Sequence, residues 1–210
     1  MAAVLASIAA CGGLTTLHVA IGAEAEADAN CLSRVRADPN GNGRVRQAGW
    51  LRQAGWLRQA GWLNRLKELC ILPESRLAKG DAAALSTLTT LTRLSLACGR
   101  QGADDAAAIA LARSVTELRH LDIAGCYLGM PRAGNAYESG GVACLAAVAQ
   151  LQQLTYLDVR GNAFTDEALL QLTALTRLRV LKASNLHNVS PGAYSRLEAA
   201  LLHARVLVES

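Results

Sequence analysis

The chain has 210 residues, 51% of them hydrophobic and 18% charged, which is enough to bury a core in one elongated domain or two small ones and excludes a disordered tail. Aromatic residues supply only 4% of the chain, so many aliphatic contacts must fill the core, and no apolar run reaches the roughly 20 residues of a membrane span. The net charge of +4 is local, because residues 31–67 carry eight bases and one acid while the rest of the chain has no excess of bases.

The first ten residues are small and apolar, and Ile8-Ala9-Ala10-Cys11 resembles the cleavage box of a bacterial lipoprotein signal. The basic segment that should precede such a box is missing. The same residues also fit a helix followed by a strand, with Leu5 and Ile8 before Leu14, Leu17 and Val19. We therefore expect this segment to belong to the folded domain, and the protein to be cytoplasmic and not exported.

Residues 24–56 are expected to be an irregular basic insertion. Within it, Leu32-x-x-Val35-x-Ala37-x-x-Asn40 offers one weak strand unit. The segment Asp38-Pro39-Asn40-Gly41-Asn42-Gly43 copies the first half of a calcium loop, but position 12 is Gly49 where a carboxylate should stand. This segment therefore predicts a turn and no bound calcium.

The hexapeptide Arg-Gln-Ala-Gly-Trp-Leu occurs three times over residues 46–63. An α-helix would place Trp50, Trp56 and Trp62 about 120° apart, whereas an extended or 3₁₀ segment would align them. An aligned row of Trp and Arg would suit contact with nucleic acid or an anionic membrane through residues 34–67. The alternative, which we favour, is a tandem expansion inside a helical or loop segment of the repeat domain.

A strand pattern then recurs along the rest of the chain. It is complete in Leu118-x-x-Leu121-x-Ile123-x-x-Cys126-x-Leu128 and in Leu154-x-x-Leu157-x-Val159-x-x-Asn162-x-Phe164. Partial copies begin at Leu14, Leu66, Leu91 and Leu178, and Val206-Leu207-Val208 predicts a last strand. Apolar residues at helical spacing precede most copies, as in Leu145, Val148 and Leu151 before Leu154. The predicted helix starts are Asp81, Asp104, Ser139, Thr165-Asp166 and Ser190-Pro191.

Each unit is thus one short strand and one helix, and neither can cover its apolar side alone, so units must stack. Successive units from Leu66 to Leu178 start 25, 27, 36 and 24 residues apart. The long interval holds a turn-rich segment, which we expect to be a loop insertion at about 129–139. The prediction is a single α/β solenoid over residues 1–210 with about six units: an open arc, parallel strands inside and helices outside.

This pattern resembles the leucine-rich repeat superfamily, and within it the ribonuclease-inhibitor-like and cysteine-containing branches. The resemblance implies that the Asn or Cys at the ninth position, here Asn162 and Cys126, satisfies backbone groups of the turn after the strand. Glu74 and Leu186 depart from the pattern at that position. The resemblance also implies that the inner strand face binds a protein partner, and association with a cytoskeletal complex would be compatible with it.

No catalytic motif accompanies the repeats. The six cysteines contain no C-x-x-C, and the four histidines lie far apart along the chain. We expect free buried cysteines, no metal, no cofactor, no small-molecule substrate and no enzymatic activity.

The candidate binding residues are the side chains expected to face outward from the strands. Basic rows flank an acidic pair, Asp122 and Asp158, which should be neighbours on adjacent strands, and such a mosaic suits a protein partner better than a uniform polyanion. The solenoid ends carry no polar capping unit, which also predicts self-association. The predicted partner-binding residues are Arg93, Arg119, His120, Asp122, Tyr156, Asp158, Arg160, Arg179 and Lys182.

Overall fold

A computed structural model of the chain describes residues 15–20, 35–37, 42–46, 65–71, 85–96, 105–130 and 140–208. Its strands are β1 (Thr16–Ala20), β2 (Val35–Ala37), β3 (Asn42–Arg46), β4 (Glu68–Ile71), β5 (Arg93–Ser95), β6 (His120–Asp122), β7 (Tyr156–Asp158), β8 (Val180–Lys182) and β9 (Arg205–Leu207). Its helices are α3 (Asp105–Ser114), α4 (Val142–Val148), α5 (Asp166–Leu170), the 3₁₀ helix η4 (Gln171–Ala174) and α6 (Pro191–Ala200).

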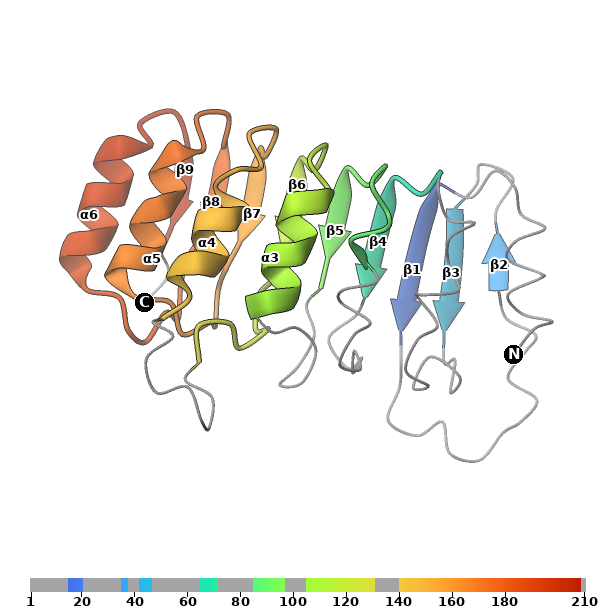
Figure 1. Cartoon of the computed structure of the whole chain (residues 1–210), viewed down its shortest axis with the longest axis horizontal. Coiled ribbons are helices and arrows are strands. Elements are labelled where there is room, and N and C mark those ends of the chain that lie inside the picture. The colour runs from blue at the N-terminus through green and yellow to red at the C-terminus, as the bar shows by residue number, and fades with distance from the viewer. Residues whose placement is uncertain are drawn as a thin grey trace.

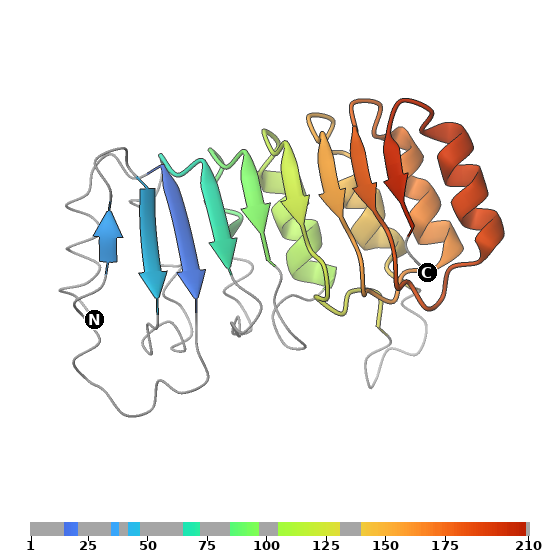
Figure 2. The same ribbon diagram turned by 180° about the vertical axis from the view of Figure 1, so that it is seen from behind.

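The strands form one nine-stranded sheet in the order β2-β3-β1-β4-β5-β6-β7-β8-β9. The helices lie side by side on one face of the β6–β9 part of this sheet, in front of it in Figure 1 and behind it in Figure 2. Packed helices are spaced about twice as widely as paired strands, so a stack of such units places the sheet on its inner curve. This is the α/β solenoid that the repeat pattern predicts.

The strands that begin after Leu91, Leu118, Leu154 and Leu178 are adjacent and parallel, which confirms the central prediction. Their registers are regular, since Leu94, Leu121, Leu157 and Leu181 align across β5, β6, β7 and β8. The predicted last strand is also present, because β9 pairs in parallel with β8. The repeat spacing in the sequence therefore corresponds directly to one strand of the sheet per unit.

The N-terminal part of the sheet differs from the expectation for residues 32–46. Strand β1 pairs directly with β4, so no unit lies between them. Instead β3 lies on the other side of β1, and β2 pairs antiparallel with β3. The weak unit at 32–40 thus supplies only β2. The turn predicted for 38–43 is wrong for Asn42 and Gly43, which lie in β3 despite their turn-forming tendency; residues 38–41 are outside the described part.

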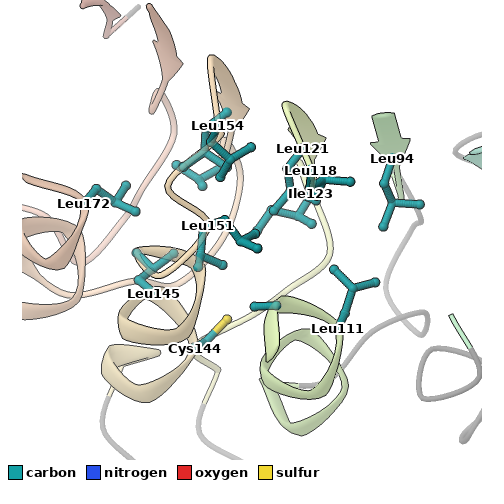
Figure 3. Packing of buried hydrophobic residues seen from close by; sticks show 14 of the residues in the cluster. Leu94, Leu111, Leu118, Leu121, Ile123, Cys144, Leu145, Leu151, Leu154 and Leu172 are labelled. Carbon is teal, nitrogen blue, oxygen red and sulfur yellow. The ribbon is translucent and has the colours of Figure 1, made fainter. Parts of the chain in front are cut away.

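The core consists of leucines that point from the strands toward the helices and from the helices toward the strands. Leu118, Leu121 and Ile123 of one repeat are at most 2% exposed, and they face Leu145 and Leu151 of the next, which are fully buried. Figure 3 shows these side chains gathered between the strand and helix layers. Because each repeat contributes to a cluster shared with its neighbours, no repeat has a core of its own.

Side chains cap two helices as predicted. Thr165 accepts a hydrogen bond from the Ala168 N–H at the start of α5, and Ser190 accepts one from the Ala193 N–H before Pro191 in α6. Helix α4 departs from the prediction of a start at Ser139, because it begins at Val142 with Gly141 as its N-cap. Ser139 itself lies outside the described residues, as do Asp81 and Asp104.

The ninth-position residues satisfy backbone groups of neighbouring turns. The Asn162 amide is 2% exposed; its Oδ1 accepts from the Leu128 N–H, and its Nδ2 donates to the Ile123 and Val159 carbonyls. The Cys126 thiol donates to the Leu96 carbonyl. At the next ninth position Leu186 is buried and the amide of Asn188 donates to the Ala163 carbonyl. The roles inferred for Asn162 and Cys126 are therefore observed, and Glu74 lies outside the described part.

Candidate interaction face

The side of the sheet opposite the helices is called the strand face below. Its outward side chains alternate with buried leucines along β4 to β8, as in the exposed, buried, half-buried sequence of Arg93, Leu94 and Ser95. The registers arrange these side chains in two rows across the strands. The first row is Glu68, Arg93, His120, Tyr156, Val180 and Arg205, and the second is Cys70, Ser95, Asp122, Asp158, Lys182 and Leu207.

The centre of the first row is a pair of stacked rings. The imidazole of His120 and the phenol ring of Tyr156 are 3.9 Å apart between centroids and 5° from parallel. On the β8 side of Tyr156, the Lys182 Nζ lies 5.6 Å from its ring centroid. On the β5 side of His120, Arg93 is its register partner. Arg93, His120 and Tyr156 of the first row and Lys182 of the second row therefore form a series of cation, ring, ring and cation across four adjacent strands.

The imidazole in this row is neutral at neutral pH. Burial, and after it the nearby positive charge of Arg93, lower the pKa of His120 to about 4 against the opposing effect of Asp122. A neutral imidazole stacks on a phenol ring without bringing a third positive charge between Arg93 and Lys182. Arg93 and Lys182 are thus separated by two uncharged rings.

The acidic pair predicted from the sequence is present, since Asp122 and Asp158 are register partners on β6 and β7. Both carboxylates, however, already have partners within the fold. Asp122 accepts from the Ser95 hydroxyl at 2.9 Å and from the Ala124 N–H at 3.1 Å. Asp158 is 1% exposed and binds the Arg160 guanidinium through both carboxylate oxygens. These acids stabilise the face and do not extend from it as free charges.

Three of the predicted residues lie beside the strands and not on them. Arg119 and Arg179 each precede their strand by one residue, so they border the strand face where β6 and β8 begin. Arg160 follows β7 and folds back onto Asp158 at 2.8 Å. The structure thus brings together Arg93, His120, Asp122, Tyr156, Asp158 and Lys182, with the three arginines at the margins.

The cations of the face are largely uncompensated. In the part of the chain that the structure describes, the only ion pair joins Arg160 to Asp158. Within the described residues no carboxylate pairs with the other cations of the face, which are Arg93, Arg119, Arg179, Lys182 and Arg205. Glu68 is the one acid of the face whose carboxylate makes no hydrogen bond or ion pair there. The strand face thus offers mostly positive charge around an aromatic centre.

Sequence reasoning missed two features of this face. It did not predict the ring stack, although His120 and Tyr156 occupy the same position in the two complete repeats, which was the available signal. It also left out Cys70 and Arg205, which the partial first and last strands bring onto the face. Burial raises the pKa of the Cys70 thiol, so this group stays protonated at neutral pH and is a poor nucleophile.

Among the described residues no three His, Cys, Asp or Glu side chains converge as metal ligands would. The helices described here are also too short or too polar to cross a membrane. The triplicated hexapeptide of residues 46–63 lies outside the described part apart from Arg46 in β3, so the alternative nucleic-acid or membrane contact through 34–67 remains a sequence-based hypothesis.

No family model matches the chain. A search of curated proteins also finds no match. Among solved structures, an internalin of Listeria monocytogenes is similar with a TM-score of 0.51 and 18% identity, covering 72% of this chain and 37% of the internalin. A leucine-rich repeat protein of Leptospira interrogans matches with a TM-score of 0.43 and 15% identity over 71% of this chain and 38% of its own. The chain thus spans less than half the length of either.

The internalin match concerns the fold alone at this level of identity, and it agrees with the repeat pattern, the strand registers and the ninth-position hydrogen bonds described above. A ribonuclease-inhibitor-like or cysteine-containing subtype is not distinguished by these matches. On these grounds the fold of this chain is a leucine-rich repeat solenoid.

Proposed function

We propose that the chain is a non-catalytic scaffold that binds a partner protein through its strand face. The observation that carries this proposal is the series Arg93, His120, Tyr156 and Lys182 across β5 to β8, in which two stacked rings lie between two cations that have no carboxylate partner among the described residues. Tyrosine and arginine are enriched among the residues that contribute most to protein–protein binding energy. Short strands fixed by a leucine core hold these side chains in place before a partner arrives, which reduces the entropy lost on binding.

The nine residues predicted from the sequence have different roles in this proposal. Arg93, His120, Tyr156 and Lys182 contact the partner directly. Asp122, Asp158 and Arg160 hold the surface in shape through the hydrogen bonds described above, while Arg119 and Arg179 extend the positive surface at the strand starts.

The experiment is affinity capture with the purified chain as bait, followed by a comparison of matched tyrosine variants. Tyr156→Ala removes the central ring, and we expect it to reduce recovery of the partner by about tenfold or more. Tyr127→Ala is the control, because Tyr127 is an exposed tyrosine in the turn after β6 and not on the strand face. Full recovery of every captured protein by Tyr156→Ala would contradict the proposed surface.

The state of the cysteines supports a proposal of cytoplasmic location. Cys70, Cys126 and Cys144 are free thiols. Cys126 in particular donates a hydrogen bond that a disulfide could not provide. A reducing compartment keeps thiols in this form.

A further inference from the structure

We propose that the partner segment bound by the strand face is an acidic stretch of polypeptide, whose carboxylates pair with Arg93 and Lys182 on either side of the His120–Tyr156 stack. This inference rests on the proposed function and adds the chemistry of the partner to it. The sequence alone does not lead to this inference, because it places the acidic pair Asp122 and Asp158 between the basic rows without showing which charges are already paired.

Charge complementarity is the first argument. Asp158 is neutralised by the Arg160 guanidinium, and Asp122 accepts hydrogen bonds from Ser95 and from its own turn. What remains for a partner is therefore mostly cationic, since Arg93 and Lys182 on the strands have no ion pair among the described residues. Glu68, the register partner of Arg93 on β4, is the one carboxylate of the strand face that is not engaged there, and it lies on the side of Arg93 away from the ring stack. A basic partner would leave these cations unpaired at the interface, and like charges brought together there would weaken binding.

The stacked rings favour the same kind of ligand. Aromatic rings carry partial negative charge on their faces and partial positive charge on their edges. His120 and Tyr156 each cover one face of the other ring, and the Lys182 ammonium lies over the Tyr156 ring, so a ligand meets Tyr156 mainly at its edge. Ring edges, the phenol O–H of Tyr156 and the N–H of a neutral imidazole all attract carboxylate oxygens.

The same geometry disfavours single-stranded nucleic acid, the other polyanion that a basic face could bind. Such binding relies on bases that stack on exposed aromatic faces. Tyr156 has no face available for a base, since His120 stacks on one side and the Lys182 ammonium lies over the ring 5.6 Å from its centroid. A base could stack on Tyr156 only after breaking one of these contacts.

The spacing of the cations fits a short extended segment. Arg93 lies on β5 and Lys182 on β8, which are three strand intervals apart, and Lys182 is two residues further along its strand than Val180, the position level with Arg93. At about 4.8 Å per interval and about 3.3 Å per residue, the two positions are roughly 16 Å apart. An extended peptide covers this distance in about five residues. A segment that crosses the strands with two acidic residues at that separation would contact both cations and pass over the ring stack.

The test measures binding of the whole chain to a fluorescein-labelled oligoglutamate peptide by fluorescence anisotropy. An oligoglutamine peptide of equal length is the uncharged control probe, and an oligothymidylate of equal length is the nucleic-acid probe. The variant Arg93→Glu/Lys182→Glu reverses both cations of the strand face. The matched control Arg113→Glu/Arg196→Glu makes the same change in net charge on exposed arginines of α3 and α6.

We expect the chain to bind oligoglutamate more tightly than the other two probes. The strand-face reversal should weaken this binding by about tenfold or more, while the helix-side reversal should change it by less than about threefold. Equal weakening by both variants would overturn the proposal, because the attraction would then come from net charge alone. Absence of oligoglutamate binding, or tighter binding of oligothymidylate, would overturn it as well. Circular dichroism checks that both variants are folded.

The two proposals fail in distinguishable ways. If oligoglutamate does not bind but Tyr156→Ala still releases the captured partner, the strand face is an interaction surface and only the acidic chemistry is wrong. If Tyr156→Ala releases nothing, the surface itself is wrong, whatever the peptide does.

Discussion

The side chain of Asn162 is buried and makes several hydrogen bonds to the backbone. Its amide joins the turn after β7 to the turn after β6 through Leu128 and Ile123. Replacing it by Ala would leave buried backbone groups of both turns without partners. We expect Asn162→Ala to lower the free energy of unfolding by about 3 kcal/mol, measured by urea denaturation.

The matched control is Asn188→Ala in the next repeat. Asn188 is exposed, and its amide donates one hydrogen bond, to the Ala163 carbonyl. Water can replace that bond, so the expected loss is about 1 kcal/mol or less. Equal losses of unfolding free energy for the two variants would show that the buried hydrogen bonds of Asn162 do not give the stacked repeats additional stability.

His120 makes the free energy of unfolding depend on pH between about 4 and about 6.5. Its pKa falls from an ordinary value of about 6.5 to about 4 in the folded chain, chiefly through burial. Between these values the unfolded chain binds the additional proton, so folding is favoured at higher pH and is weakened as the pH falls from about 6.5 toward 4. We expect His120→Gln to flatten this part of the profile in urea denaturations, and NMR titration of the wild-type imidazole to give a midpoint near 4. A midpoint near 6.5 would contradict the buried, stacked environment.

At the level of the helices, α4 begins in a way that only glycine allows. Gly141 has a φ of 75°, and a Cβ there would lie 2.3 Å from Cδ1 of the buried Phe164 ring. Gly125 is a matched control, with a φ of 65° and no atom within 4 Å of its Cβ position. Gly125→Ala should cost about 1 kcal/mol from the left-handed backbone alone. Gly141→Ala should cost about 3 kcal/mol or more, and similar thermal shifts for the two would refute the proposed contact.

This helix also shows where sequence reasoning reaches its limit. The periodicity of Leu145, Val148 and Leu151 predicts the helix and its buried side, because burial imposes that spacing directly. The capping tendency of Ser139 predicts a start there, but α4 begins after Gly141, whose backbone packs against the Phe164 ring from the segment after β7. That contact joins residues that are distant in sequence, and local propensity carries no information about it.

The leucine pattern likewise predicts the arrangement of some strands of the sheet and not of others. Parallel order and register from β5 to β8 follow from the spacing of the leucines, because each unit must cover its neighbour. The positions of β2 and β3 do not follow, because that segment lacks the leucine pattern and joins the sheet beyond β1. On the strand face, the adjacency of Asp122 and Asp158 was predictable from register alone. The partners of their carboxylates were not, since these depend on side-chain rotamers.

Across the whole molecule, stability should be distributed unit by unit, because backbone hydrogen bonds join each strand only to its neighbours. The Ile123 N–H donates to the Asp158 carbonyl, and the Val159 N–H donates to the Lys182 carbonyl, so β7 supports both β6 and β8. In such a stack a defect in the middle weakens both sides, whereas a defect in the last unit is confined to that end.

Substitutions at two leucines of nearly equal burial test whether stability is distributed unit by unit. Leu157 of β7 is fully buried, and Leu201 after α6 is 1% exposed, so Leu157→Ala and Leu201→Ala should each cost about 3 kcal/mol in local stability. In hydrogen exchange measured by mass spectrometry, we expect Leu157→Ala to lower protection in β6, β7 and β8. Leu201→Ala should lower it in α6, β8 and β9 and leave β5 and β6 protected. An equal loss of protection at β5 in both variants would show that the solenoid unfolds as one cooperative unit, and the nearest-neighbour account of its stability would then be wrong.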